Sequence, residues 1–283
     1  PPDVAGDVVV HALRNYPGAV VTDVASVKEP IAKCVLERVS NLAQRYVGSH
    51  PMAGRERSGA ASARADLFDA CPWVLVATPA TSPNALSAVR QLAIDLGALP
   101  TQLGAAEHDR AVALISHTPQ LVASALAARL EQAPEMALNL AGQGLRDTTR
   151  IAASDPRLWA AILNANRSSV AQVLRELRVD IDALIEALEQ GRGSVGTVVD
   201  VMQRGNLGRD RIPGKHGGAP SRYAEVMVLI PDAPGQLARL FNDVGAAQVN
   251  IEDLVIEHSA GQRQGLATLL VAPAAAVGLR QAL

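Results

Sequence analysis

A polar, glycine-rich stretch at residues 48–59 carries the side chains best suited to chemistry. It reads Gly-Ser-His-Pro-Met-Ala-Gly-Arg-Glu-Arg-Ser-Gly and puts His50, Glu56 and two arginines on one loop. Glycine permits close approach of the backbone to a ligand, and Pro51 stiffens the turn that carries His50. Neutral imidazole suits general-base work near pH 7. A surface loop with a solvated histidine is the alternative, and the residues that accompany His50 favour the catalytic interpretation.

Strands and helices alternate around this loop. Residues 19–23 and 73–78 are short apolar runs typical of buried strands, and helices are predicted at about 4–15, 28–46, 61–67 and 83–96. This alternation predicts a mostly parallel α/β sheet over residues 1–100. Ligands of such sheets bind beyond the carboxyl ends of the strands, where Ser26 and His50 fall.

The pattern becomes helical from Glu107 onward and is rich in alanine and leucine. A long helix at about 108–132 should kink at Pro119, where Ser116, His117 and Gln120 lie. Ser116 and Gln120 are four residues apart and so share a face. Helices this apolar bury more than one face, which favours a homodimer over a monomeric bundle.

A glycine- and proline-rich basic stretch at 203–222 predicts a linker. The residues after it follow a β-α-β-β-α order, the beginning of a ferredoxin-like unit. The predicted fold is therefore α/β plus all-α plus α+β. Its domains are a partial Rossmann-like parallel sheet at 1–100, a helical domain at 101–202, the linker at 203–222 and a small C-terminal domain at 223–283.

The composition of the chain limits the classes of partner that it is expected to bind. The chain has 283 residues, is 48% hydrophobic and has a net charge of -2, so nothing in its charge points to nucleic acid or to an acidic membrane surface. Two cysteines fit neither a disulfide framework nor a metal cluster, which favours the reducing cytoplasm. No apolar run is expected to span a membrane, and residues 1–30 do not resemble a signal peptide.

Four segments, taken in order, resemble the motifs of the prephenate dehydrogenase family. They are Val-Thr-Asp-Val-Ala-Ser-Val-Lys at 21–28, Gly-Ser-His-Pro-Met-Ala-Gly at 48–54, Ile-Ser-His-Thr-Pro-Gln at 115–120 and Asp-Thr-Thr-Arg-Ile-Ala-Ala-Ser-Asp-Pro-Arg-Leu-Trp at 147–159. The resemblance implies an enzyme of tyrosine biosynthesis. Such an enzyme oxidises prephenate with NAD or NADP, releasing carbon dioxide and 4-hydroxyphenylpyruvate, and His50 and Ser26 would be its catalytic pair.

The resemblance also implies binding roles. Arg150 matches a carboxylate-binding arginine, although it could instead pair with a neighbouring aspartate. Ser116 and His117 match positions that line the substrate pocket, with a buried, satisfied histidine as the alternative for His117. Gln120 stands where many prephenate-specific members have histidine, so arogenate remains an alternative substrate. Glu56 matches a carboxylate near the pocket mouth or forms a solvated ion pair with its flanking arginines.

Cofactor contacts are implied for Asp23, Ser26 and Pro51. The family binds its dinucleotide through a G-x-G-x-x-G turn after the first strand, and no such turn is recognised here. The chain opens as though earlier strands precede it, and these 283 residues alone are expected to bind the cofactor weakly.

The C-terminal domain resembles an ACT domain in two segments, 230–237 and 249–253. The resemblance implies a regulatory site for tyrosine, and a purely structural role is the alternative. The implied ligand-binding residues are Asp232, Ala233, Gly235, Gln236, Leu237, Asn250 and Ile251.

Overall fold

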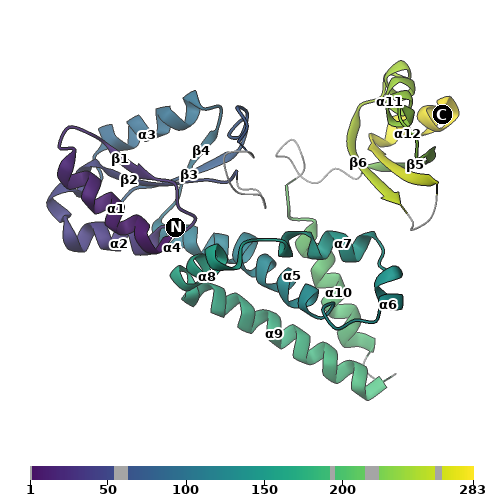
Figure 1. Ribbon diagram of the computed structural model, residues 1–283, viewed down its shortest axis with the longest axis horizontal. Coiled ribbons are helices and arrows are strands. Elements are labelled where there is room, and N and C mark those ends of the chain that lie inside the picture. The colour runs from purple at the N-terminus through teal and green to yellow at the C-terminus, as the bar shows by residue number, and fades with distance from the viewer. Residues whose placement is uncertain (1, 54–62, 192–194, 214–222, 259–262) are drawn as a thin grey trace. The chain divides into compact units, whose positions relative to one another are not determined.

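The computed structural model describes residues 2–53, 63–191, 195–213, 223–258 and 263–283. It divides into two compact units, coloured along the chain in Figure 1. The first unit holds Pro1–Gln132 and Asp147–Val179, and the second holds Ala133–Arg146 and Asp180–Leu283.

A four-stranded sheet forms the centre of the first unit. Its strands are β1 (Val21–Asp23), β2 (Tyr46–Pro51), β3 (Pro72–Val76) and β4 (Leu99–Gln102), in the order β1-β2-β3-β4. The outer pairs are parallel, as predicted, whereas β2 and β3 are antiparallel. Parallel neighbours need a crossover helix, but antiparallel ones do not. In agreement, the described part of the predicted helix at 61–67 consists of turns and irregular backbone.

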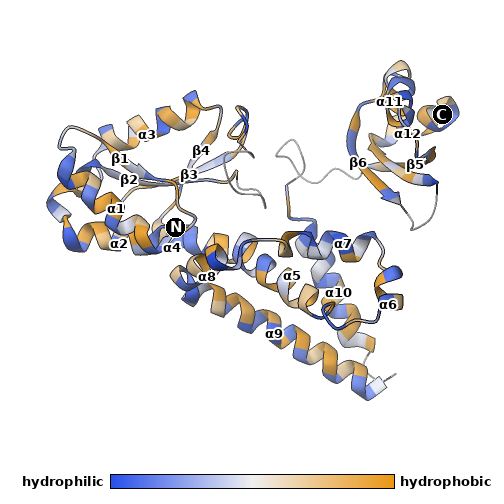
Figure 2. Cartoon of the chain, in the orientation of Figure 1, coloured by the Kyte–Doolittle hydropathy of each residue, from blue (hydrophilic) through white to orange (hydrophobic). Residues whose placement is uncertain are grey.

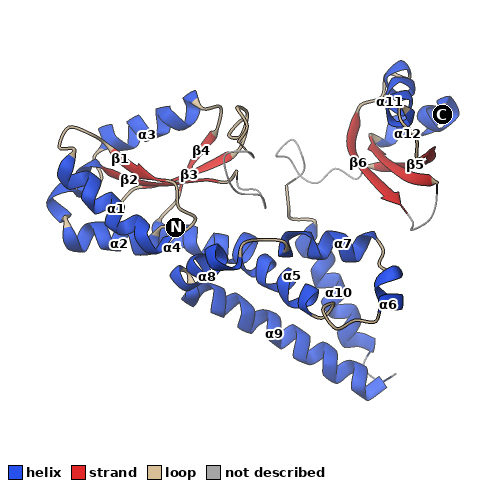
Figure 3. Cartoon of the chain, viewed as in Figure 1, coloured by secondary structure: helices blue, strands red, loops and turns tan. Residues whose placement is uncertain are grey.

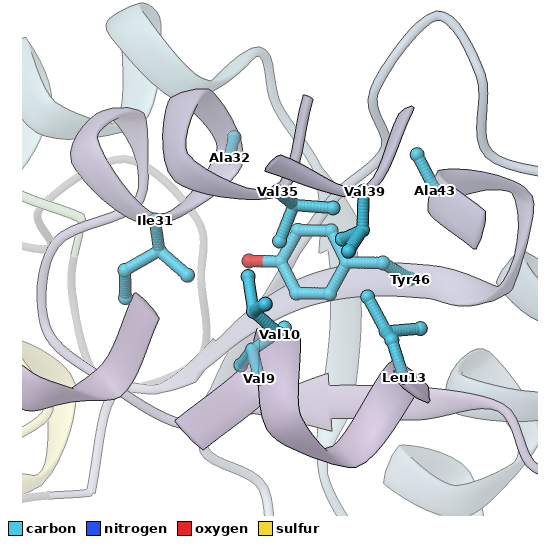
Figure 4. Close-up of a cluster of buried hydrophobic side chains, with 9 residues drawn as sticks. All are labelled: Val9, Val10, Leu13, Ile31, Ala32, Val35, Val39, Ala43 and Tyr46. Carbon is cyan, nitrogen blue, oxygen red and sulfur yellow. The ribbon is translucent and has the colours of Figure 1, made fainter. Parts of the chain in front are cut away.

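Helices cover both faces of this sheet (Figure 1, Figure 3). Successive strand residues point to opposite faces, so Tyr46 packs among α1 (Pro2–Asn15) and α2 (Glu29–Arg38), as Figure 4 shows. Its neighbour Val47 packs with α3 (Pro83–Asp95) instead. α2 ends at Arg38 and is followed by a 3₁₀-helix, η1 (Ser40–Arg45), rather than continuing to residue 46. Ser82 caps α3 by accepting a hydrogen bond from the Ala85 amide at 3.2 Å.

A nearly continuous helical run follows the sheet. α4 (Ala105–Val112) leads into a π-helical turn, η3 (Ala113–His117), and then into α5 (Thr118–Ala128). The irregularity expected from Pro119 therefore lies in the turn before the proline, and π-helical turns often mark functional sites. Among the described residues, 105–128 form one helix long and apolar enough to cross a membrane, contrary to expectation. Its buried His108, Asp109 and His117 belong to the core of this unit instead.

Three more elements complete the first unit. They are the 3₁₀-helix η4 (Arg150–Ala152), α8 (Pro156–Ala165) and the first part of α9 (Arg167–Gln190). Asp155 caps α8 by accepting a hydrogen bond from the Arg157 amide at 2.8 Å. The capping aspartate and the following Pro156 fix where α8 begins.

The second unit contains helices and a small sheet. Its helices are α6 (Glu135–Asn139), most of α7 (Gln143–Thr149), α10 (Val195–Arg209), α11 (Gln236–Ala246) and α12 (Pro273–Ala282). α10 extends through residues 203–209, which were predicted as linker. Large apolar side chains are exposed on α9 and α10, including Leu188, Met202 and Leu207, and Figure 2 colours these positions by hydropathy.

The strands of this unit are β5 (Ala224–Pro231), β6 (Ile251–His258) and β7 (Gln264–Val271). They form an antiparallel sheet in the order β5-β7-β6, so the predicted β-α-β-β-α sequence of elements is confirmed. Leu240 and Val244 of α11 and Leu279 of α12 pack against one face of the sheet.

Candidate active site

A cavity of about 470 Å³ lies within the first unit. Three segments distant in sequence contribute the predicted residues Ser26, His50, Ser116, His117 and Gln120. Ser154 and Asp155 add polar groups, and the apolar wall consists of Met52, Ile115, Pro119, Ile151, Leu158, Trp159 and Ile162. A mostly apolar cavity with a few convergent polar groups is typical of a small-molecule site.

His50 is held by strand pairing rather than by a loop. It lies in β2, opposite Val74 of β3, so the prediction of a loop histidine is wrong. The ring Nδ1 is 2.9 Å from Nε2 of His108. Burial, together with the positive charges that His108, Lys28 and His117 can carry, lowers the pKa of His50 to about 3. The ring is therefore neutral at pH 7 and free to accept a proton.

Two buried residues that continue the hydrogen bonding from His50 were not singled out from the sequence. His108 and Asp109 of α4 are buried, and His108 Nδ1 lies 2.7 Å from Asp109 Oδ1. The Asp109 carboxylate also accepts hydrogen bonds from the backbone amides of Lys28 at 2.8 Å and Glu29 at 2.9 Å. The available signal was a run of four ionisable residues, 107–110, at the start of a helical stretch that is otherwise rich in apolar residues.

His117 both lines the cavity and is hydrogen-bonded inside the unit. Its Nδ1 is 3.1 Å from Nδ2 of Asn166, which also donates to the Asp109 carbonyl at 2.7 Å. Its ring meets Trp159 edge-on, with centroids 6.0 Å apart. Burial lowers the pKa of His117 to about 4, so this ring is also neutral at pH 7. Both interpretations of His117 from the sequence describe part of its environment.

Two family models match the chain, one over residues 1–100 and one over residues 104–204. Residues 1–100 match the sequence model of the prephenate dehydrogenase nucleotide-binding domain, and residues 104–204 match that of the prephenate dehydrogenase dimerization domain. The chain belongs to the prephenate dehydrogenase family.

Relatives and solved structures agree with this family. The chain is 36% identical over 236 residues to the probable prephenate dehydrogenase NovF of Streptomyces niveus, and 28% identical over 239 residues to prephenate dehydrogenase of Bacillus subtilis. These alignments cover 80% and 83% of the chain but only 65% and 64% of the two relatives. The chain thus spans slightly less than two thirds of their lengths.

Two structures illustrate the shared fold. Synechocystis arogenate dehydrogenase is 31% identical, with a TM-score of 0.63 over 75% of this chain and 76% of that one. Aquifex aeolicus prephenate dehydrogenase, in complex with hydroxyphenyl propionate and NAD+, is 28% identical, with a TM-score of 0.63 over 73% of this chain and 74% of that one.

Asp23 does not have the cofactor-binding environment that its family motif implied. Its carboxylate forms a buried ion pair with Lys28 and accepts hydrogen bonds from the Tyr46 hydroxyl at 2.8 Å and the Ala25 amide at 3.0 Å. Lys28 also donates to the Ser49 carbonyl at 2.7 Å. Burial lowers the pKa of Lys28, while Asp23 opposes that shift. The Asp23 carboxylate is thus engaged by Lys28, Tyr46 and Ala25 within the first unit.

Gly48, in the family's histidine motif, serves the same buried cluster. A Cβ at this position would lie 3.1 Å from the Tyr46 hydroxyl and 3.3 Å from Cδ of Lys28. The glycine therefore makes room for Tyr46 and Lys28, not for a ligand as its sequence context suggested. Pro51 does not line the cavity, whereas its neighbours His50 and Met52 do.

One predicted anchor of the family, Arg150, is not among the residues that line the cavity. Arg150 is exposed at the start of η4, and the cavity is lined by the following residue, Ile151, instead. A short 3₁₀ turn directs consecutive side chains to different sides, which separates Arg150 from Ile151. Glu56 lies outside the described residues.

The G-x-G-x-x-G spacing of dinucleotide-binding turns does occur, at residues 191–196. It lies between α9, which ends at Gln190, and α10, which begins at Val195. The phosphate-binding turn joins a strand to a helix, so this match lacks the required context.

The predicted regulatory residues fall into two groups that do not converge within the chain. Asp232, Ala233 and Gly235 follow the end of β5, and Gln236 and Leu237 begin α11. Asn250 and Ile251 lie at the start of β6, and both Ile251 and Ala224 pair with Val271 of β7. The start of β6 is thus level with the start of β5. A parallel β-α-β connection places the two groups at opposite ends of the sheet.

Proposed function

We propose that this protein is a prephenate dehydrogenase that oxidises prephenate with NAD or NADP to 4-hydroxyphenylpyruvate and carbon dioxide. The observation that carries the proposal is the meeting of Ser26, His50, Ser116 and His117 at one cavity, from three segments of the chain. The names of the relatives and family domains support it.

His50 is the base in this mechanism. Its neutral ring accepts the proton of the ring hydroxyl while the hydride leaves the same carbon. Ser26 hydrogen-bonds the hydroxyl or the imidazole and holds it in place. Loss of the ring carboxylate as carbon dioxide makes the ring aromatic, and the proton returns to the phenolate oxygen. The apolar wall around Trp159 receives the ring and excludes water from it.

The cofactor supplies the hydride acceptor when it is bound. The residues at the strand ends fit its nicotinamide end, because Ser26 and Met52 follow β1 and β2 and line the cavity. The described residues at these strand ends do not include a glycine-rich phosphate turn. We therefore assign only the nicotinamide side to this part of the chain. The Aquifex aeolicus relative in complex with NAD+ supports the cofactor class.

Arogenate dehydrogenase is the second candidate. Arogenate carries an ammonium group where prephenate has a keto group, and the cavity offers the Asp155 carboxylate and the Gln120 amide but no arginine or lysine among its described lining residues. These groups can accept hydrogen bonds from an ammonium. Arg150, which precedes the lining residue Ile151, remains the proposed anchor for a substrate carboxylate.

Turnover of the two substrates tests the function. We expect the purified full-length protein to convert prephenate with NAD or NADP, forming reduced cofactor and carbon dioxide in equal amounts. Faster turnover of arogenate would assign the second candidate. No turnover of either substrate with either cofactor would contradict the proposed function.

The proposed assembly is a cytoplasmic homodimer. The match of residues 104–204 to a dimerization domain and the exposed apolar side chains of α9 and α10 support the dimer. The balanced charge and the two cysteines support the cytoplasm.

The C-terminal unit is proposed to be an ACT domain that binds tyrosine. The β-α-β-β-α order, the β5-β7-β6 sheet and the left-handed Gly235 at the start of α11 support this assignment. Because the two groups of predicted ligand residues lie at opposite ends of one sheet, a site that uses both requires two copies. Titration of tyrosine into the full-length dimer should give measurable heat, and its absence at millimolar tyrosine would favour a structural role.

A further inference from the structure

We propose that His108 and Asp109 act through His50 as a proton relay. When His50 takes a proton from the substrate, it passes a second proton to His108. The inference rests on the proposed function, because it names how the charge of the base is handled in that reaction. Neither residue contacts the cavity directly, since neither is among its lining residues.

The two imidazoles are arranged for transfer along a single line of hydrogen bonds. Nδ1 of His50 faces Nε2 of His108 at 2.9 Å, and Nδ1 of His108 faces Oδ1 of Asp109 at 2.7 Å. A carboxylate accepts hydrogen bonds, so His108 Nδ1 carries the hydrogen and Nε2 is the acceptor. His50 Nδ1 must then donate to it. This leaves Nε2 of His50 without a hydrogen, as a base toward the cavity requires.

Asp109 is held as the anionic end of this line. The backbone amides of Lys28 and Glu29 donate to its two oxygens, at the start of α2. Backbone donors and the positive end of the helix dipole both stabilise a negative charge. The Asn166 side-chain amide donates a hydrogen bond to the backbone carbonyl of Asp109. The carboxylate is therefore positioned to balance one positive charge on His108.

The relay is balanced in atoms and charge. The substrate hydroxyl proton bonds to His50 Nε2 while the His50 Nδ1 hydrogen passes to His108 Nε2. His50 is then neutral again, and His108 is an imidazolium beside the Asp109 carboxylate. After carbon dioxide has left, the two transfers reverse and the phenolate oxygen of the product receives its proton. The relay needs no additional reactant.

The environment of His50 disfavours a positive charge on this ring beside the cavity. Burial and the positive charges that His108, Lys28 and His117 can carry lower the pKa of His50, and Asp109 raises it. Lys28 is paired with Asp23, and His117 is hydrogen-bonded to Asn166. The carboxylate hydrogen-bonded to the two imidazoles is that of Asp109, which contacts His108.

The substitution His108→Gln tests proton transfer separately from the positioning of the His50 ring. The glutamine oxygen can still accept the His50 Nδ1 hydrogen, but the amide cannot take up a proton. We expect kcat to fall about 10²-fold, within the usual range for a positioned acid or base, with KM little changed. In mixtures of H₂O and D₂O, the rate of the natural protein should depend on deuterium content along a curve, because two protons move. In the variant, the dependence should become linear.

Two further variants complete the comparison. Asp109→Asn should lower kcat and move the acidic limb of its pH profile to lower pH, because the Asp109 carboxylate raises the pKa of His50 and its loss removes that effect. His11→Gln on the exposed surface of α1 is the matched control, with unchanged kinetics. Near-normal kcat and an unchanged solvent isotope dependence in His108→Gln would overturn the relay.

A measurement without turnover separates this inference from the proposed function. ¹⁵N NMR of the histidine rings should find both His50 and His108 with the hydrogen on Nδ1. A hydrogen on Nε2 of His108 at neutral pH would overturn the relay, whatever the substrate. Absence of turnover in the natural protein, with the expected tautomers present, would instead contradict the proposed function alone.

Discussion

Replacing His50 with asparagine should lower kcat about 10²- to 10⁴-fold in the full-length protein, the usual contribution of a positioned general base. Asparagine can preserve a polar side chain in β2 but cannot accept the substrate proton at neutral pH. The apolar wall and Gln120 remain, so substrate binding should be affected much less than turnover. Steady-state kinetics with the preferred substrate measure this effect.

His11→Asn is the control for this substitution, because His11 is exposed on α1. It should leave kcat unchanged, and thermal melting should show that both variants are folded. A kcat for His50→Asn within about twofold of the natural protein would remove His50 from the mechanism.

Replacing Lys28 with methionine should lower the free energy of unfolding by about 3–5 kcal/mol, as expected when one partner of a buried ion pair is removed. The Lys28 side chain is fully buried, and its ammonium contacts the Asp23 carboxylate and the Ser49 carbonyl. Methionine fills similar space but removes the cation that pairs with the Asp23 carboxylate and the ammonium that donates to the Ser49 carbonyl. Urea unfolding measured at pH 7 gives the difference.

The chain provides a matched control on the same helix. Lys33 pairs with Glu37 at 3.8 Å, and both side chains are mostly exposed. An exposed helical pair contributes only about 0.3–0.5 kcal/mol, so Lys33→Met should change stability little. Equal stability of the two methionine variants would show that the Lys28 ion pair does not support the strand ends beneath the cavity.

The sequence located the cavity residues that belong to local motifs. Ser26, His50, Ser116 and His117 were each predicted from short segments, and the structure places all four around one cavity. The resemblance to a family supplied the order of these segments, and the strand and helix patterns placed them near the sheet edge. Local patterns sufficed for these residues because each lies at the end of an element or at an irregularity.

Contacts between distant segments could not be read in the same way. His50 meets His108 across 58 positions of the chain, and Asp109 meets the Lys28 amide across 81. Asp23 seemed available for the cofactor because its motif does not reveal that Lys28 and Tyr46 fold back onto it. The antiparallel pairing of β2 with β3 likewise could not be read from local patterns, and the described residues of their connection do not form the predicted helix.

The most direct test is a crystal structure of the full-length protein with the product 4-hydroxyphenylpyruvate and a nicotinamide cofactor. We expect the phenol oxygen to lie within 2.6–3.2 Å of His50 Nε2, the range for a base and its proton donor. We also expect the product ring to pack against Trp159. A product bound elsewhere, or bound in the cavity with its phenol oxygen turned away from His50, would contradict the account.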